Sequence, residues 1–282
     1  MKAELLSPVA AELGESPVWR QESGDIFWVD ILRGDIHRLA LDGEDQLAAT
    51  FEEPVGALAL GPNGEVVAAT PRGLVRLDGS TVTSLERESN DLRMNDGKAD
   101  PAGRFVGGTM TIGSPQPRAG SLWRFDERGA SRLVSDVTIP NGLSWSADGE
   151  TFYWIDTPTG RIDAFDYDPA TGELNDRRAW VSIPEEAGVP DGMCGDVEGG
   201  LWVALWGGSA VHRYAAGRLD AVVEVGASLV TCPVFAGPEL DQLVITTASL
   251  DSPPGEQGAG DIFTIRLGVR GAPAHRLGSW AR

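Results

Sequence analysis

The chain has 282 residues and a net charge of −19, from 42 acidic and 23 basic side chains. A surface of that charge repels nucleic acid and anionic lipid, so we expect neither nucleic acid nor a membrane as a partner. The two cysteines, Cys194 and Cys232, are too few for the disulfide framework of a secreted domain, and the N-terminus lacks the apolar run of a signal peptide. We therefore expect a cytoplasmic protein, either a monomer or a weak homo-oligomer.

A pattern of turn and strand recurs six times along the chain, in copies that start near residues 14, 55, 94, 140, 190 and 230. The clearest copy is PNGLSWSADG at 140–149, which runs into the β-rich segment TFYWID. A third strand such as GRIDAFDYD and a weaker apolar fourth strand complete each unit. Repeats of about 40–50 residues with four strands each are typical of propeller blades. The sequence therefore predicts an all-β, six-bladed β-propeller with four-stranded antiparallel blades around a central channel, as a single domain over residues 1–282.

A strand from one end of the chain has to close this ring, and two segments compete for that role. AELLSPVA at 3–10 resembles the fourth strand that precedes each of the other copies, and AHRLGSW at 274–280 is the alternative. Either strand would remove an open sheet edge. The sequence leaves both segments open.

The innermost strands of a propeller all begin at the same face, so their first residues point toward one place on the axis. These residues are Glu15, Gly56, Asn95, Asn141, Asp191 and Thr231. Four of the six carry a carboxylate or a carboxamide, although Asn and Asp are poor strand residues, and such groups need water or a cation when they are buried together. Their oxygens suit one divalent cation, with Ca²⁺ as the first candidate and Mg²⁺, Mn²⁺, Fe²⁺ or Zn²⁺ as alternatives. The competing interpretation is that the Asn-Gly and Asp-Gly pairs only form turns.

The loops after the second strands are expected at the same face as these residues. The longest of them lie at 108–120 and 248–260, and Met110 with its neighbours is a candidate for a lid over the substrate. Asp30 and Asp156 end their second strands one strand further from the axis. We expect these two to cap turns or to support the site rather than to bind the cation.

Five segments that span nearly the whole chain match one known family in its own order. They are LGESPVW at 13–19, RMNDGKADPAGRFVGGTM at 93–110, IPNGLSWSADG at 139–149, VPDGMCGDVEGGLWVA at 189–204 and GVRG at 268–271. Together they resemble the gluconolactonase/regucalcin (senescence marker protein) family. The resemblance implies a six-bladed propeller with one divalent cation on Glu15, Asn141 and Asp191. It also implies that a sugar lactone is hydrolysed to an aldonic acid. In that family the residues at Arg93 and Asn95 contact substrate oxygens, with Asp96 and Lys98 nearby.

The residue chemistry suits that reaction, because a lactone is an activated ester that needs only modest assistance. A cation would polarise the lactone carbonyl or activate a water. Asp191 would serve as a ligand and as the general base for the attacking water, while Arg93 would bind hydroxyls and developing negative charge. The sequence has no G-x-S-x-G motif, which disfavours covalent catalysis.

Two alternative functions stay open at this point. The same oxygen-rich site would serve a phosphotriesterase or arylesterase, and it would also serve a non-catalytic calcium-binding propeller. One departure from the family concerns the substrate, because some members carry an acidic residue soon after the GTM of the third blade. This chain has TIGSPQ at 111–116 instead, so the sequence does not select a particular sugar.

Overall fold

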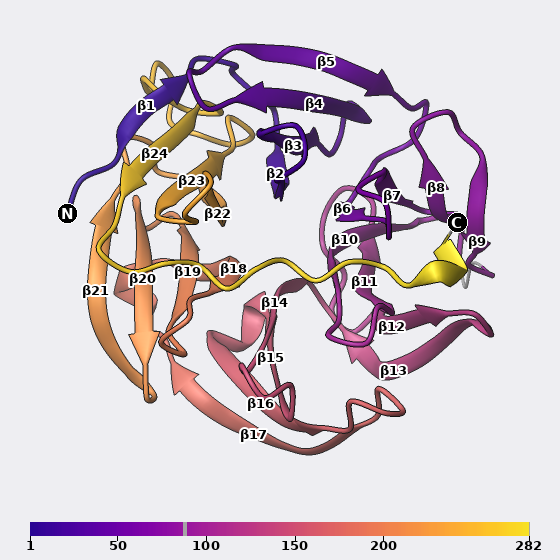
Figure 1. The fold of residues 1–282 in the computed structure, drawn as a ribbon. Coiled ribbons are helices and arrows are strands. Elements are labelled where there is room, and N and C mark those ends of the chain that lie inside the picture. Colours follow the sequence, from indigo (N-terminus) through magenta and orange to yellow (C-terminus); the bar gives the residue numbers. More distant parts are fainter. Residues whose placement is uncertain (87–88, 282) are drawn as a thin grey trace.

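The computed structural model describes residues 1–86 and 89–281, and its strands form six four-stranded antiparallel sheets. The sheets stand around a central axis as blades (Figure 1), which confirms the predicted six-bladed β-propeller. The described residues also form three 3₁₀ helices, η1 (Thr157–Thr159), η2 (Glu185–Ala187) and η3 (Ser279–Ala281). None of the helices in this part of the chain is long and apolar enough to cross a membrane.

Within each blade the strands follow one another outward from the channel. The innermost strands are β2 (Gly14–Arg20), β6 (Ala57–Leu60), β10 (Leu92–Ala99), β14 (Pro140–Trp145), β18 (Val189–Gly195) and β22 (Val230–Ala236). The second strands are β3 (Asp25–Asp30), β7 (Val66–Thr70), β11 (Phe105–Thr111), β15 (Thr151–Asp156), β19 (Leu201–Trp206) and β23 (Gln242–Thr247). The third strands are β4 (Asp35–Ala40), β8 (Gly73–Arg76), β12 (Gly120–Asp126), β16 (Arg161–Tyr167), β20 (Ala210–Ala215) and β24 (Ile262–Arg266). The outer strands are β5 (Asp45–Thr50), β9 (Thr81–Ser84), β13 (Gly129–Val137), β17 (Leu174–Ser182), β21 (Arg218–Glu224) and β1 (Glu4–Ser7).

The N-terminal strand closes the ring. β1 pairs antiparallel with β24, with Leu5 opposite Phe263, and so becomes the outer strand of the last blade. The C-terminal segment has a different course, because after β24 it crosses the mouth of the central channel toward the blade of β6–β9 (Figure 1). Of the two segments that the sequence left open, residues 4–7 therefore close the ring, and they cover the edge of β24.

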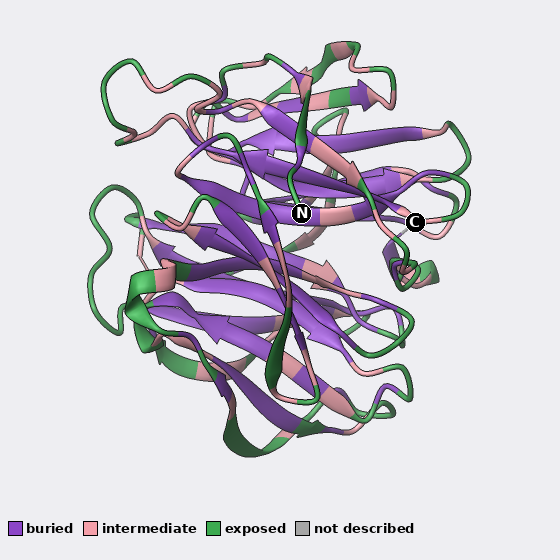
Figure 2. Cartoon of the chain, turned by 90° about the vertical axis from the view of Figure 1, so that its left-hand side faces the viewer, coloured by how far each residue is buried: buried purple, intermediate pink, exposed green. Residues whose placement is uncertain are grey.

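Burial decreases from the inner strands to the rim of the ring. Every residue of β3 and β7 is buried, whereas most of β17 is exposed or half-buried (Figure 2). A second strand is covered on both faces by the neighbouring blades, which explains near-continuous apolar stretches such as VVAAT in β7. An outer strand has solvent on one side and keeps polar residues there.

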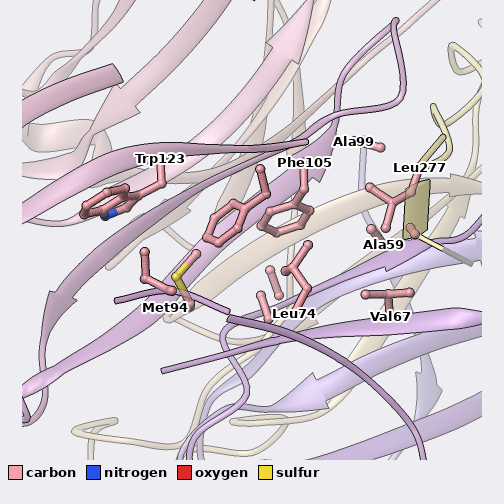
Figure 3. Close-up of a cluster of buried hydrophobic side chains, with 13 residues drawn as sticks. Ala59, Val67, Leu74, Met94, Ala99, Phe105, Trp123 and Leu277 are labelled. Carbon is pink, nitrogen blue, oxygen red and sulfur yellow. The ribbon is translucent and has the colours of Figure 1, made fainter. Parts of the chain in front are cut away.

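The hydrophobic core lies between adjacent blades rather than at the axis. One cluster joins Leu74 of β8 to Met94, Phe105 and Trp123 of the next blade, and Leu277 of the C-terminal segment completes it (Figure 3). Each pair of blades buries apolar side chains in this way. Because the apolar residues are used between the blades, the channel itself is left to other side chains.

Two buried aspartates hold the turns that follow β10 and β18. Asp196 accepts hydrogen bonds from the backbone N–H groups of Glu198 and Gly200 at 2.9 and 2.8 Å, and from Nε of Arg213 at 2.7 Å. Asp100 makes the equivalent contact with Nε of Arg104 at 2.5 Å. These buried charges are paired and hydrogen-bonded, so they stabilise the turns.

Candidate active site

The first residues of four inner strands come together in a buried group. Glu15, Asn95, Asn141 and Asp191 are each between 5 and 8% exposed, and the neighbouring Arg93 is 6% exposed. With Asp96, which is 2% exposed, they form what we call the polar cluster. The equivalent positions in the other two inner strands hold Gly56 and Thr231, so the cluster draws its side chains from four of the six blades.

Each strand that supplies the polar cluster has a β-bulge at the residue concerned. The pairing register shifts between Glu15 and Val18, and the same happens at the cluster residues of β10, β14 and β18. In contrast, β6 pairs regularly with β7 and supplies no polar side chain. A bulge re-aims side chains, and in β10 it allows the consecutive residues Asn95 and Asp96 both to be part of the cluster.

A chain of hydrogen bonds fixes the neutral members of the cluster. Nη1 of Arg93 donates to Oδ1 of Asn95 at 2.7 Å, and Nδ2 of Asn95 donates to Oδ1 of Asn141 at 2.6 Å. Nδ2 of Asn141 donates to Oγ1 of Thr157 at 2.7 Å, and that hydroxyl donates to the carbonyl of Pro190 at 2.8 Å. The chain of bonds thus orients the amide oxygen of Asn141 and ends beside Asp191.

Thr157 and Ser16 belong to this arrangement, although the sequence analysis did not identify them. Thr157 follows the second strand of its blade and orients Asn141, as described above. Ser16 has a φ of 47°, a left-handed conformation that is strained for serine, and its N–H donates to Oε2 of Glu15 at 2.5 Å. A left-handed serine has no sequence signature, so only the structure reveals how the Glu15 carboxylate is held.

Gly56 explains why one blade adds no polar group at this level. A Cβ atom there would lie 2.3 Å from the carbonyl oxygen of Met94 and 2.7 Å from that of Asn95. The backbone before β6 therefore packs directly against the segment of β10 that presents Asn95. Any larger residue would displace that segment.

The carboxyl groups of the cluster are buried without enough positive charge to match them. Burial and the nearby Asp96 raise the pKa of Glu15 to about 8. Burial, Glu15 and Asp96 together raise the pKa of Asp191 well above its usual value. Arg93 is the positive charge beside them, and its own burial lowers its pKa to about 10, so it remains charged at neutral pH.

Asp96 and Lys98 lie further along β10 than the residues discussed so far. Oδ1 of Asp96 accepts a hydrogen bond from the N–H of Gly97 at 2.6 Å, but Oδ2 is buried and has no partner among the described residues. The Lys98 ammonium donates to the carbonyl of Met193. Although burial by itself lowers it, the neighbouring Cys232 and Asp96 raise the pKa of Lys98 above its usual value, so the group stays charged.

Chemically, the polar cluster fits a divalent cation. Its donors are carboxylate and amide oxygens, which suit hard cations such as Ca²⁺. No group of three Asp, Glu, His or Cys side chains in the described part of the chain is arranged to hold a metal ion, so the third ligand would have to be the amide oxygen of Asn141. That oxygen accepts one hydrogen bond and has a second lone pair. The unpaired Oδ2 of Asp96 and the raised pKa values of Glu15 and Asp191 indicate negative charge that a cation would balance.

Met110 lies inside a strand rather than in a loop. It belongs to β11, is 4% exposed and pairs with Arg93 in the sheet. The loop proper begins after Thr111, and residues 112–119 are all exposed. A lid could thus include residues 112–119, but not Met110, which the strand holds in place.

Both long loops are attached beside the start of the inner strands. The N–H of Ile112 donates to the carbonyl of Asp91 at 2.7 Å, just before Arg93. The N–H of Leu250 donates to the carbonyl of Glu12 at 2.9 Å, just before Glu15. The loops after β11 and β23 therefore flank the mouth of the channel that holds the polar cluster.

Asp30 and Asp156 cap the turns that lead into this mouth. Oδ2 of Asp30 accepts a hydrogen bond from the N–H of Glu12 at 2.8 Å, and Oδ1 accepts one from Leu13 at 3.0 Å. Oδ1 of Asp156 accepts one from the N–H of Ile139 at 2.8 Å. Each aspartate thus fixes the backbone that enters the strand of a cluster residue.

Residues 13–249 match the SMP-30/Gluconolactonase/LRE-like region. Regucalcin of Bos taurus is 35% identical over 292 residues, covering 98% of each chain. The crystal structure of a calcium-binding protein, regucalcin, from Agrobacterium tumefaciens is similar with a TM-score of 0.91 and 28% identity, covering 99% of this chain and 97% of that one. A gluconolactonase from Xanthomonas campestris shares the fold, with a TM-score of 0.74 and 23% identity over 91% of this chain and 86% of its own.

Proposed function

The chain belongs to the SMP-30/gluconolactonase/LRE-like family, and from this premise we propose that it hydrolyses a sugar lactone to the aldonic acid. The proposed reaction takes place at the polar cluster and uses one divalent cation, with Ca²⁺ as the first candidate. A calcium-binding relative of known structure and a gluconolactonase of the same fold support this choice of cation and reaction.

One observation carries the proposal: the channel mouth holds buried acids that form no ion pair within the described part of the chain. Glu15 and Asp191 are 5 and 7% exposed, and burial together with the neighbouring carboxylates raises their pKa values despite the opposing charge of Arg93. Such an arrangement costs stability, so it indicates a function at this place. A propeller that served only as a scaffold would not need it.

Glu15, Asn141 and Asp191 are the residues that we propose to hold the cation. When bound, the cation supplies a Lewis acid that polarises a carbonyl or lowers the pKa of a water. Asn95 and Thr157 orient Asn141 by hydrogen bonds of 2.6 and 2.7 Å, so they act as positioning residues. The N–H of Ser16 does the same for Glu15.

Asp191 is the group that we propose to accept the proton of the attacking water. A carboxylate in ordinary surroundings is a weak base, but burial beside Glu15 and Asp96 raises the pKa of Asp191. The raised pKa belongs to the metal-free site and a bound cation would lower it, so we propose Asp191 as the base because it would lie beside the water held by the cation. The proton taken from water would then pass from the carboxyl to the alkoxide that leaves as the lactone ring opens.

Arg93 is the residue that we propose to bind the substrate through its side chain. Its Nη1 is used in bonds to Asn95 and to the carbonyl of Met94, whereas its Nε is buried without a partner among the described residues. A sugar hydroxyl or the developing oxyanion would supply that partner. Met110 pairs with Arg93 in the sheet, so its predicted contact with substrate would be apolar.

The test is a metal add-back assay with a substrate panel. Metal is removed by chelation, and acid release from five- and six-carbon aldonolactones is followed as Ca²⁺, Mg²⁺, Mn²⁺, Fe²⁺ or Zn²⁺ is restored, with an aryl phosphotriester as the control substrate. We expect metal-dependent turnover of at least one lactone that exceeds turnover of the phosphotriester. The Asp191→Ala variant should lose this lactone turnover while remaining folded. If no lactone turns over faster than in buffer with any metal, the proposal is wrong.

A further inference from the structure

The channel has a second pocket at the end opposite the polar cluster. Its volume is about 310 Å³, within the range of small-molecule sites. Its walls are formed by the last residues of inner strands, among them Trp19 of β2, Trp145 of β14 and Phe235 of β22. Since the cluster is built from the first residues of the same strands, the two sites occupy opposite mouths.

The C-terminal segment roofs this pocket. We call residues 270–278 the strap, and its residues 272–276 line the pocket. At one end the N–H of Ala272 donates to the carbonyl of Gly195 at 3.0 Å, and at the other the N–H of Leu277 donates to the carbonyl of Leu60 at 2.8 Å. The strap thus connects opposite sides of the ring, as the ribbon shows (Figure 1). It covers one side of the pocket.

The charge of the pocket is opposite to that of the whole chain. The chain has 42 acidic side chains, yet none of the described residues that line the pocket is Asp or Glu. Its charged lining residues are Lys98 and Arg276, and Arg276 already pairs with Glu22 at 2.5 Å. The remaining charge in the pocket is therefore the Lys98 ammonium, which interacts with Asp96 and Glu15 of the polar cluster but forms no ion pair among the described residues.

Lys98 has hydrogen-bonding capacity to spare. An ammonium group has three donors, and one of them is used by the carbonyl of Met193. Within the described part of the chain the other two have no partner, although the group is half-buried at the centre of the channel. The hydroxyl of Ser144, which also lines the pocket, has no partner among the described residues either. A buried charge with free donors is suited to an anionic ligand.

The remaining walls are apolar and aromatic. Trp19 and Trp145 come from blades that face each other across the ring, and Phe235 and Leu143 also line the pocket. A flat or branched apolar body fits such walls better than a hydrated inorganic ion does. The ligand should therefore combine one negative charge with an apolar part.

We propose that this pocket, which we call the strap pocket, binds a small organic monocarboxylate. Its carboxylate accepts hydrogen bonds from the Lys98 ammonium, and its apolar body packs between Trp19 and Trp145 beneath the strap. The inference does not depend on the proposed lactonase activity, although the two sites are neighbours: Lys98 follows Asp96 by two residues on β10, and Ser16, whose N–H holds Glu15, also lines the pocket. If the strap pocket does not bind a carboxylate, the proposed lactonase activity is unaffected. If the chain does not hydrolyse lactones, the proposed binding in the strap pocket is unaffected.

The test uses benzoate as the probe and the lysine side chains as reporters. The chain contains only two lysines, Lys2 and Lys98, so a protein labelled with [¹⁵N]lysine gives two Nζ signals, which Lys2→Met assigns. In the Ca²⁺-saturated protein we expect benzoate to shift the Lys98 signal in a saturable manner with one site per chain. Benzamide, which has the same shape and no charge, should bind at least about tenfold more weakly.

Variants locate the site, with binding followed by calorimetry. Lys98→Met should weaken benzoate binding at least about tenfold, and Lys2→Met is the matched control that should not. Ala274→Trp, on an exposed part of the strap, should fill the pocket and abolish binding even if Lys98→Met fails to fold. Arg93→Gln tests the other mouth and should leave benzoate binding unchanged.

Three results would overturn the proposal. The first is that benzoate leaves the Lys98 signal unmoved up to millimolar concentration. The second is that benzamide binds as well as benzoate. The third is that Arg93→Gln removes benzoate binding while Ala274→Trp retains it, because the anion would then lie in the polar cluster.

Discussion

Buried aspartates at the two mouths of the channel have pKa values that are shifted in opposite directions, and strand β18 runs from one mouth to the other. Asp191 near its start is 7% exposed, and burial raises the pKa of its carboxyl well above the usual value. Asp196, just after its end, is 4% exposed, yet hydrogen bonds from Arg213, Gly200 and Trp202 overcome the effect of burial and lower its pKa. Burial alone therefore does not identify a functional acid. The distinguishing feature is whether the fold itself supplies the partner.

The largest effect is expected when these two aspartates are replaced, each in its own variant, by alanine. Asp191→Ala should reduce kcat for the best lactone about a thousandfold, because it removes both the proposed base and a proposed ligand. The metal-free protein should stay folded or become more stable, since an uncompensated buried carboxyl is lost. Activity assays and thermal unfolding measure the two quantities.

Asp196→Ala is the matched control for that prediction. It leaves Arg213 without its buried partner, so it should lower the free energy of unfolding by about 3–5 kcal/mol. The molecules that remain folded should turn over lactone at the normal rate. The comparison fails if Asp196→Ala is as inactive per folded molecule as Asp191→Ala.

The strap should stabilise the fold without taking part in the proposed lactone hydrolysis. Leu277 is 2% exposed and packs in the cluster of Figure 3. Leu277→Ala should therefore lower the free energy of unfolding by about 2–4 kcal/mol, while kcat/KM of the folded protein is unchanged. Leu5→Ala, at a position that is 54% exposed, should change stability by less than about 0.5 kcal/mol. A large loss of kcat/KM in Leu277→Ala would show that the two ends are coupled.

At the cluster end, Arg93 should matter for its geometry as well as its charge. Arg93→Lys keeps the charge but loses the bond to Asn95 and the free Nε donor, so kcat/KM should fall about 10- to 100-fold. Arg218→Lys, at an exposed position on β21, is the control and should have no effect. Steady-state kinetics on the best lactone decides between these outcomes. An Arg93→Lys enzyme with unchanged kcat/KM would remove Arg93 from the proposed mechanism.

The smallest effect is on stability as a function of pH. The Glu15 carboxyl loses its proton near pH 4.5 when the chain is unfolded and near pH 8 when it is folded. Between these values the folded state holds more protons, so the stability of the metal-free protein should fall as the pH rises from about 5 to 8, by several degrees in Tm. Added Ca²⁺ should raise the Tm more at pH 8 than at pH 5. In Glu15→Gln the slope should become smaller, and a Tm of the metal-free protein that rises with pH would contradict the raised pKa.

The sequence by itself determined the architecture, because the repeat of turn and alternating strand is a local signal. Glu15, Asn95, Asn141 and Asp191 could be placed at one mouth because they occupy equivalent positions in copies of that repeat. The structure places them together in that way, and their roles in catalysis and cation binding remain predictions.

Only the tertiary structure decided how those side chains are aimed and which segment closes the ring. The left-handed Ser16 is held by the next blade, since its hydroxyl accepts a hydrogen bond from the N–H of Leu58 at 2.8 Å, and no local pattern encodes that contact. Asn95 and Asn141 are 46 residues apart and meet through the packing of two blades. The strap is decided in the same way, since part of it was a candidate for the closing strand and its actual course is fixed by partners as distant in sequence as Leu60. Local sequence specifies the repeated strands and turns, and contacts between residues distant in sequence specify the departures from that repeat.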